Sequence, residues 1–123
     1  MTAAALAARI EHAVLSPEAT ETDIAEQAQA AIQWGVRALV VKPCHVSLAA
    51  RLLAGSGVKT VSVVGFPHGN STIETKAQEA QQAVACGTDE IDMVLNIGAF
   101  GSRLPRLCSA RSRRWSKPPP GIR

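Results

Sequence analysis

The sequence predicts an α/β fold in which short parallel strands alternate with helices. Three short apolar segments, at residues 38–41, 58–65 and 90–95, alternate with segments whose apolar residues recur at helical spacing. Glycines mark the short connections between them. A short continuous apolar run such as 38–41 is typical of a strand buried on both faces of a parallel sheet. Such strands alternating with helices indicate βαβ units with right-handed crossovers.

The first 35 residues are expected to form two helices. The segment Ala3–His12 predicts the first helix, which is followed by a break at Pro17. Thr20, with Asp23 three residues later, resembles a capping box and begins the second helix. Gly35 is a natural stop for that helix.

The middle of the chain is expected to supply two strands with a helix between them. The first strand, 38–41, ends at Pro43. A helix follows at Val46–Leu53, and the valine-rich segment Val58–Gly65 is the second strand.

A further helix and a third strand are expected after the loop at residues 66–70. Ser71 or Thr72 begins the helix, which runs to about Cys86, and the strand spans Glu90–Leu95. Three strands cannot close a sheet. The chain is therefore either a small open sheet or part of a (β/α)₈ barrel of roughly 250 residues. In both architectures the chemistry lies at the carboxyl ends of the strands.

Composition excludes several classes of protein. The 123 residues are 46% hydrophobic and 19% charged, and no apolar run approaches the roughly 18 residues that a membrane span needs. The N-terminus lacks the pattern of a secretory signal. The three cysteines are odd in number and widely spaced, so neither a zinc site nor a disulfide framework is expected. This cysteine usage indicates the cytoplasm.

Asp92 is the residue that the spacing singles out for catalysis. It interrupts an apolar strand, where a buried carboxylate is costly unless it is paired. Alternate residues of a strand share a face, so Asp92 and Asn96 are expected to point to one site. The open alternatives are a proton-relay carboxylate beside a lysine and a structural aspartate bonded to the backbone or an arginine.

The lysines are expected to be surface residues. Lys42, at a strand end, would be a Schiff-base amine only if desolvation favoured its neutral form. Its favoured interpretation is a solvated lysine beside a proline, and Lys59 and Lys76 are also expected to be solvated.

Two further features at strand ends are weaker signals. The loop 65–71, which includes Phe66, precedes a helix whose first amides could bind an anion. Cys44 follows a strand end and is expected to line a pocket or to pack as a small residue. The three histidines are far apart, so no metal site is expected.

Four motifs resemble one enzyme family: IEH at 10–12 with Leu15 and Pro17, VKP at 41–43, VGFPHG at 64–69 and TDEIDMVLNIGA at 88–99. On these motifs residues 6–100 resemble deoxyribose-phosphate aldolase. This lysine-dependent (class I) aldolase cleaves 2-deoxyribose 5-phosphate to glyceraldehyde 3-phosphate and acetaldehyde. The last motif is the most specific, and the match would be the first third to half of a family member.

The resemblance implies that residues 1–100 are the N-terminal part of a (β/α)₈ barrel, with about three strands. It implies a cytoplasmic lyase with no cofactor, a phosphorylated sugar as substrate and a possible homodimer for the full-length family. Asp92 would be the proton donor or acceptor. Glu11, Cys44, Phe66 and Asn96 would line the active site.

The chain departs from the family in two ways. Glu11, Ala13 and Lys42 stand where the family usually has Asp, Thr and Asn. The family's Schiff-base lysine lies on a later strand, in a Val-Lys-Thr-Ser-Thr-Gly type motif that the 123 residues do not contain. The chain alone is therefore expected to be inactive.

Residues 101–123 are expected to be a separate, disordered basic tail. They hold seven Lys/Arg and no acid, whereas residues 1–100 hold six Lys/Arg and all ten Asp/Glu. One explanation is a frameshift near Phe100–Leu104, because another reading frame of 110–123 can encode a helix of the kind the family has there. The alternative function is a non-enzymatic α/β fragment whose basic tail binds nucleic acid without sequence preference.

Overall fold

The computed structural model describes residues 1–102 of the chain. One parallel sheet runs in the order β1 (Glu11–Val14), β2 (Ala38–Val41), β3 (Lys59–Val64), β4 (Glu90–Met93). The other elements are α1 (Ala3–Ala7), α2 (Glu21–Trp34), the 3₁₀ turn η1 (Pro43–His45), α3 (Val46–Leu53), α4 (Ile73–Ala85) and α5 (Ile97–Gly101). A helix connects each strand to the next, so the predicted α/β fold with parallel strands is confirmed.

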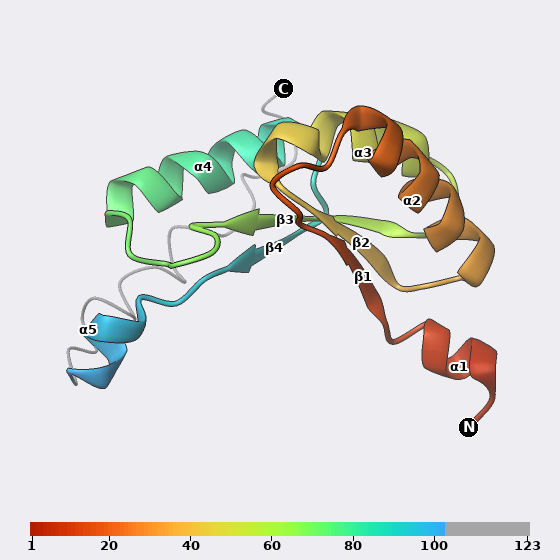
Figure 1. Ribbon diagram of the computed structural model, residues 1–123, viewed down its shortest axis with the longest axis horizontal. Coiled ribbons are helices and arrows are strands. Elements are labelled where there is room, and N and C mark those ends of the chain that lie inside the picture. Colours follow the sequence, from red (N-terminus) through yellow and green to blue (C-terminus); the bar gives the residue numbers. More distant parts are fainter. Residues whose placement is uncertain (103–123) are drawn as a thin grey trace, which may run out of the picture.

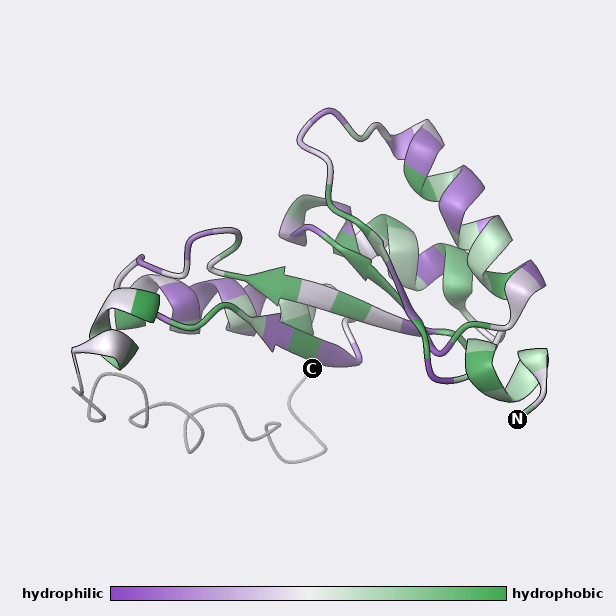
Figure 2. Ribbon diagram, turned by 60° about the horizontal axis from the view of Figure 1, so that its bottom comes forward, coloured by the Kyte–Doolittle hydropathy of each residue, from purple (hydrophilic) through white to green (hydrophobic). Residues whose placement is uncertain are grey.

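The helices α2, α3 and α4 cover one face of the sheet (Figure 1). The core beneath α2 and α3 is built from Leu39 and Val41 of β2 and from small or branched residues of the two helices, among them Ile24, Ala28 and Ala49. Alanines let the helix backbones come close to the sheet. In Figure 2, β3 carries green bands separated by paler ones, and bands of both colours lie along α2 and α4.

The opposite face of the sheet carries the alternate strand residues. Ala38 and Val40 of β2 and Val61 and Val63 of β3 form a second apolar cluster there, joined by Leu15. Both faces of β2 are thus apolar, as the continuous apolar run at 38–41 predicted. In β3 the alternate residues Thr60 and Ser62 are buried polar residues. In the described part of the chain no helix covers this second face (Figure 1).

The start of α2 follows the predicted capping box. The Thr20 hydroxyl accepts the backbone N–H of Asp23, and the Asp23 carboxylate accepts the backbone N–H of Thr20 at 2.7 Å. At the other end Gly35 has φ +64°, the left-handed conformation that ends a helix.

We expect Thr20→Ala to lower the free energy of unfolding by about 1 kcal/mol, because it leaves amides of the first turn without their side-chain acceptor. Urea unfolding followed by circular dichroism measures the change. Thr22→Ala, an exposed position on the same turn, is the matched control and should be neutral or slightly stabilising. Equal losses from the two substitutions would show that the cap contributes nothing.

The prediction of a first helix over Ala3–His12 is wrong for its second half. Helix α1 ends at Ala7, and Glu11–Val14 forms β1 instead, so the sheet has four strands rather than three. Glu11 pairs with Ala38 at the start of a parallel ladder, and the N–H of Arg37 donates to the carbonyl of Ile10 at 2.9 Å. Pairing with a buried strand overrides the helix propensity of the preceding alanines.

The last described residues also differ from the prediction. The strand predicted at Glu90–Leu95 ends at Met93, and a short unpredicted helix, α5, follows. The predictions of a disordered, out-of-frame tail and of its nucleic-acid binding fall almost wholly on residues 103–123, which lie outside the described residues. Among residues 1–102 no helix is long and apolar enough to cross a membrane.

Candidate active site

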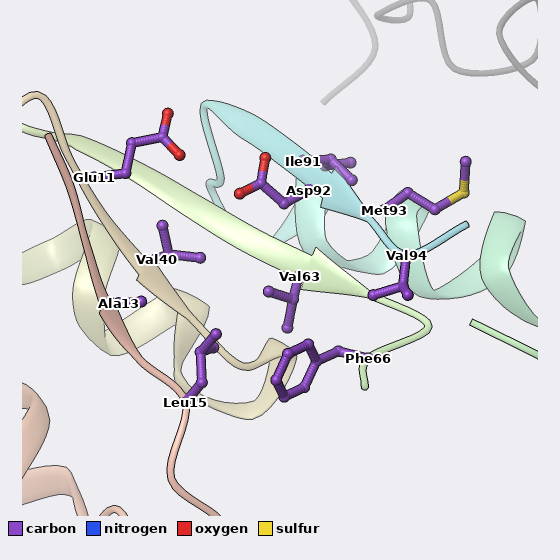
Figure 3. A pocket seen from close by; sticks show the side chains of 10 residues that line it. All are labelled: Glu11, Ala13, Leu15, Val40, Val63, Phe66, Ile91, Asp92, Met93 and Val94. Carbon is purple, nitrogen blue, oxygen red and sulfur yellow. The ribbon is translucent and has the colours of Figure 1, made fainter. Parts of the chain in front are cut away.

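An open pocket of about 550 Å³ lies on the face of the sheet that α2 and α3 leave uncovered (Figure 3). All four strands and the loop after β3 contribute to its wall, through Glu11, Ala13, Leu15, Val40, Val63, Phe66, Ile91, Asp92, Met93 and Val94. Most of these side chains are apolar. The polar groups are the two carboxylates: in Figure 3 that of Asp92 extends across the sheet toward the side of Glu11, whose own carboxylate lies at the rim of the group.

Asp92 lies near the carboxyl end of β4, opposite Val63 of β3 in the ladder. Its side chain is exposed rather than buried, because β4 is an edge strand of the described sheet. Within residues 1–102 its carboxylate forms no hydrogen bond or ion pair. A solvated carboxylate on an apolar wall can accept or donate a proton to a bound molecule.

The pocket brings together three of the five predicted site residues. Glu11 and Phe66 join Asp92 in its wall. Cys44 lies outside it, exposed in η1 after β2. Asn96 also lies outside it, because β4 ends at Met93 and the alternation of faces stops there. Its side-chain oxygen accepts the backbone N–H of Ala99 at 3.0 Å and caps α5.

The amino end of the sheet holds a network of four charged side chains. Arg37 contacts both carboxylate oxygens of Glu90 at 2.7–2.8 Å and also pairs with Glu11. Lys59 pairs with the same Glu90. The network thus links β1, β3 and β4 across the uncovered face, and the Glu11 carboxylate is held by an arginine.

Two groups of this network, Glu90 and Arg37, have shifted pKa values. Hydrogen bonds from Lys59 and Arg37 hold the pKa of Glu90 below its ordinary value. The pKa of Arg37 is raised, chiefly by its hydrogen bond to Glu90 and less by the charges of Glu11 and Asp92. Sequence reasoning missed Arg37, since a lone arginine before a strand carries no motif.

We expect Glu90→Gln to make the free energy of unfolding depend less steeply on pH at acid pH. A carboxylate whose folded pKa is depressed stabilises the fold above the ordinary glutamate pKa and loses that contribution as pH falls through the lower, folded value. The substitution should cost less than about 1 kcal/mol at pH 7, because the pair is partly exposed. Unfolding midpoints from pH 7 down to pH 3 provide the measurement.

The control for this profile is Glu26→Gln on the exposed side of α2. This substitution should leave the pH dependence of the free energy of unfolding as it is in the unmodified chain. If Glu90→Gln and Glu26→Gln give the same profile, the ion pairs at the amino end of the sheet do not contribute to acid sensitivity.

Of the three lysines in residues 1–102, Lys42 and Lys59 are accessible to solvent and Lys76 is buried. Lys42 donates to the carbonyl of Ser16 at 2.7 Å, and Lys59 is half exposed in its ion pair. The prediction that Lys76 is solvated is wrong, because its side chain is only 5% exposed and its ammonium contacts the carbonyls of Gly69 and Val94. The absence of a side chain at Gly65 leaves room for its stem. The helical spacing of Lys76 with Ala80 and Ala83 indicates the buried stripe of α4, but the usual exposure of lysine favoured a solvated side chain.

Relatives of the chain were found by sequence. It is 50% identical over 97 residues to the deoxyribose-phosphate aldolase of Methanothermobacter thermautotrophicus, a match that covers 79% of this chain and 43% of that protein. It is 46% identical over 97 residues to the enzyme of Clostridium kluyveri, covering 79% and 44%. The chain thus spans less than half the length of the curated relatives it matches. No family model matches it.

Solved structures agree with the sequence relatives. A crystal structure assigned to a deoxyribose-phosphate aldolase from Coccidioides immitis superposes with a TM-score of 0.84 at 30% identity, over 88% of this chain and 43% of that one. The tetrameric deoxyribose phosphate aldolase from Aeropyrum pernix gives a TM-score of 0.75 at 36% identity, over 79% and 42%. The four strands and their helices therefore match part of an aldolase barrel.

Proposed function

Because the chain is homologous to the deoxyribose-phosphate aldolases over less than half of their length, we propose that it supplies the first four strands of such an aldolase and one part of its active site. The reaction is the reversible aldol cleavage of 2-deoxyribose 5-phosphate to glyceraldehyde 3-phosphate and acetaldehyde. The relatives by sequence share this enzyme name. The pocket between β1 and β4 is the part of the site assigned to these residues.

The observation that carries this proposal is Asp92 in the pocket. Cleavage through a lysine imine needs a group that takes the proton from the substrate hydroxyl as the carbon–carbon bond breaks, and a group that returns a proton to the enamine that remains. An accessible carboxylate near the carboxyl end of a barrel strand is suited to that relay. Asp92 has this position, and its apolar surroundings, including Leu15 and Phe66, form a wall for the substrate.

We assign no covalent role to the three lysines of residues 1–102. The ammonium groups of Lys42, Lys59 and Lys76 are held by Ser16, Glu90 and the backbone of the loop after β3, respectively. None of the three lines the pocket around Asp92. The fourth lysine, Lys117, lies outside the described residues. We therefore expect the 123-residue chain alone neither to form the imine nor to turn over substrate.

A chimera tests the proposal. Residues 1–100 would be followed by the portion of the Clostridium kluyveri enzyme that lies beyond its match to this chain. We expect the chimera to release glyceraldehyde 3-phosphate from 2-deoxyribose 5-phosphate, and the 123-residue chain to release none. A chimera that folds but does not cleave, or turnover by the chain alone, would overturn the proposal.

The proposed function also carries expectations for the division of the chain, for cofactors and for the compartment. Residues 1–100 are assigned to the barrel part and residues 101–123 to a separate tail. The reaction needs no cofactor or metal, and the cytoplasm is its compartment.

A further inference from the structure

Two charged side chains of α4 hold the backbone of the loop between β3 and α4. The carboxylate of Glu79 accepts the N–H of Gly65 at 2.7 Å, and the ammonium of Lys76 contacts the carbonyl of Gly69. The two residues are three positions apart, so they project from the same face of the helix. The N–H of Gly69 donates to the carbonyl of Gly65 at 2.7 Å and closes the held segment on itself.

Lys76 also connects this loop to the chain after β4. Its ammonium donates to the carbonyl of Val94 at 2.8 Å, while the N–H of Val94 donates to the carbonyl of Val64 at 2.9 Å. Gly69 is buried directly against the carbonyl of Leu95. One buried side chain therefore joins α4, the loop and the segment that follows β4.

The held segments carry two residues of the pocket wall. Phe66 lies between the anchored Gly65 and Gly69, and Asp92 lies two residues before the anchored Val94. Both line the pocket on the uncovered face (Figure 3). A shift of either anchor would move the phenylalanine ring relative to the carboxylate.

Stability alone is a weak explanation for a charge in this position. A buried ammonium has a large desolvation penalty, and replacement of buried charged groups by apolar groups of similar volume is often neutral or stabilising. Donation to two carbonyls from different segments fixes their separation, which an apolar side chain does not do.

We propose that Lys76 and Glu79, here called the α4 clamp, are positioning residues that set where Phe66 and Asp92 lie in the pocket. The inference rests on the proposed function only in taking this pocket as the site of reaction. The clamp holds the loop through Gly65 and Gly69, and holds the end of β4 through Val94.

The test compares Lys76→Met with the matched control Gln78→Met, an exposed position on the same helix, in the 123-residue chain. Amide hydrogen exchange is followed at residues 65–70 and 94–96 and, as a reference, in α2. Removal of charge-assisted hydrogen bonds should speed exchange in the first two segments by about tenfold to a hundredfold, with α2 unchanged. Gln78→Met should leave exchange unchanged both at residues 65–70 and 94–96 and in α2.

A second readout reports the pocket itself. Phe66 and Phe100 are the two phenylalanines of the chain, so fluorophenylalanine labelling gives two ¹⁹F signals, which Phe66→Leu assigns. Lys76→Met should shift or broaden the folded-state signal of Phe66. A loss of stability alone would add an unfolded signal and leave the folded one in place.

The proposal is overturned if Lys76→Met speeds exchange uniformly, including α2, or leaves the Phe66 signal unmoved. If Lys76→Met does not fold, Glu79→Met decides, since it releases only the Gly65 amide. Faster exchange confined to residues 65–70 supports the clamp, and any other pattern contradicts it. Neither readout measures catalysis, so an inactive chimera would remove the proposed function and leave this result standing.

Discussion

Asp92→Asn in the chimera should lower kcat for cleavage of 2-deoxyribose 5-phosphate by at least about a hundredfold. Loss of a general acid–base group costs roughly 10²–10⁴ in rate, and an amide cannot take up the proton that the carboxylate accepts. The substitution preserves shape and should leave stability nearly unchanged, because the side chain is exposed and forms no hydrogen bond within residues 1–102. Initial rates of glyceraldehyde 3-phosphate release provide the measurement.

Two controls make the result specific to Asp92. Glu26→Gln, which also removes one negative charge but lies on the exposed side of α2, should retain full activity. Glu11→Gln tests the second carboxylate of the pocket, which is already paired with Arg37 and should matter less. Wild-type kcat in the Asp92→Asn chimera would exclude the relay role.

The second large effect concerns the fold around the pocket. Gly69→Ala should lower the free energy of unfolding by about 3 kcal/mol. Gly69 has φ +69°, a conformation that costs a non-glycine residue roughly 1–2 kcal/mol. In addition, a methyl group there would overlap the backbone carbonyl of Leu95, and overpacking of this kind costs roughly 1–3 kcal/mol.

Gly35→Ala separates these two contributions. Gly35 has a similar φ of +64°, but a side chain there would meet nothing within 4 Å. We expect it to cost only about 1 kcal/mol, the conformational part alone. Denaturant unfolding of both variants gives the difference. Equal losses would show that the loop does not approach the end of β4 closely.

The elements of the fold that were predictable are those with strong local signals. The capping box at Thr20, the stop at Gly35 and the apolar run 38–41 each depend on residues close in sequence, and the structure has the predicted elements there. The strand β1 was not predictable in this way. It is four residues long, and each of its residues pairs with a residue of β2 that lies 27 positions later in the chain.

The site was predictable only in part, for a similar reason. Asp92 stands out because a charge interrupts an apolar strand, and the motif that contains it marks the family. Arg37 has no local signal, since its role comes from partners on other strands. The helical spacing of Lys76 indicates burial, but it does not identify the carbonyls that its ammonium contacts. The expected proximity of Asp92 and Asn96 assumed a strand that continued to residue 95, whereas β4 ends at Met93.

The most direct test of the account is borohydride reduction in the presence of 2-deoxyribose 5-phosphate, followed by peptide mass mapping of the 123-residue chain and of the chimera. We expect a reduced sugar adduct on a lysine in the Clostridium kluyveri portion of the chimera and no adduct on the 123-residue chain. An adduct on any of the four lysines of the 123-residue chain would contradict this expectation, because it would place the reacting amine in the part of the enzyme to which only the proton relay is assigned.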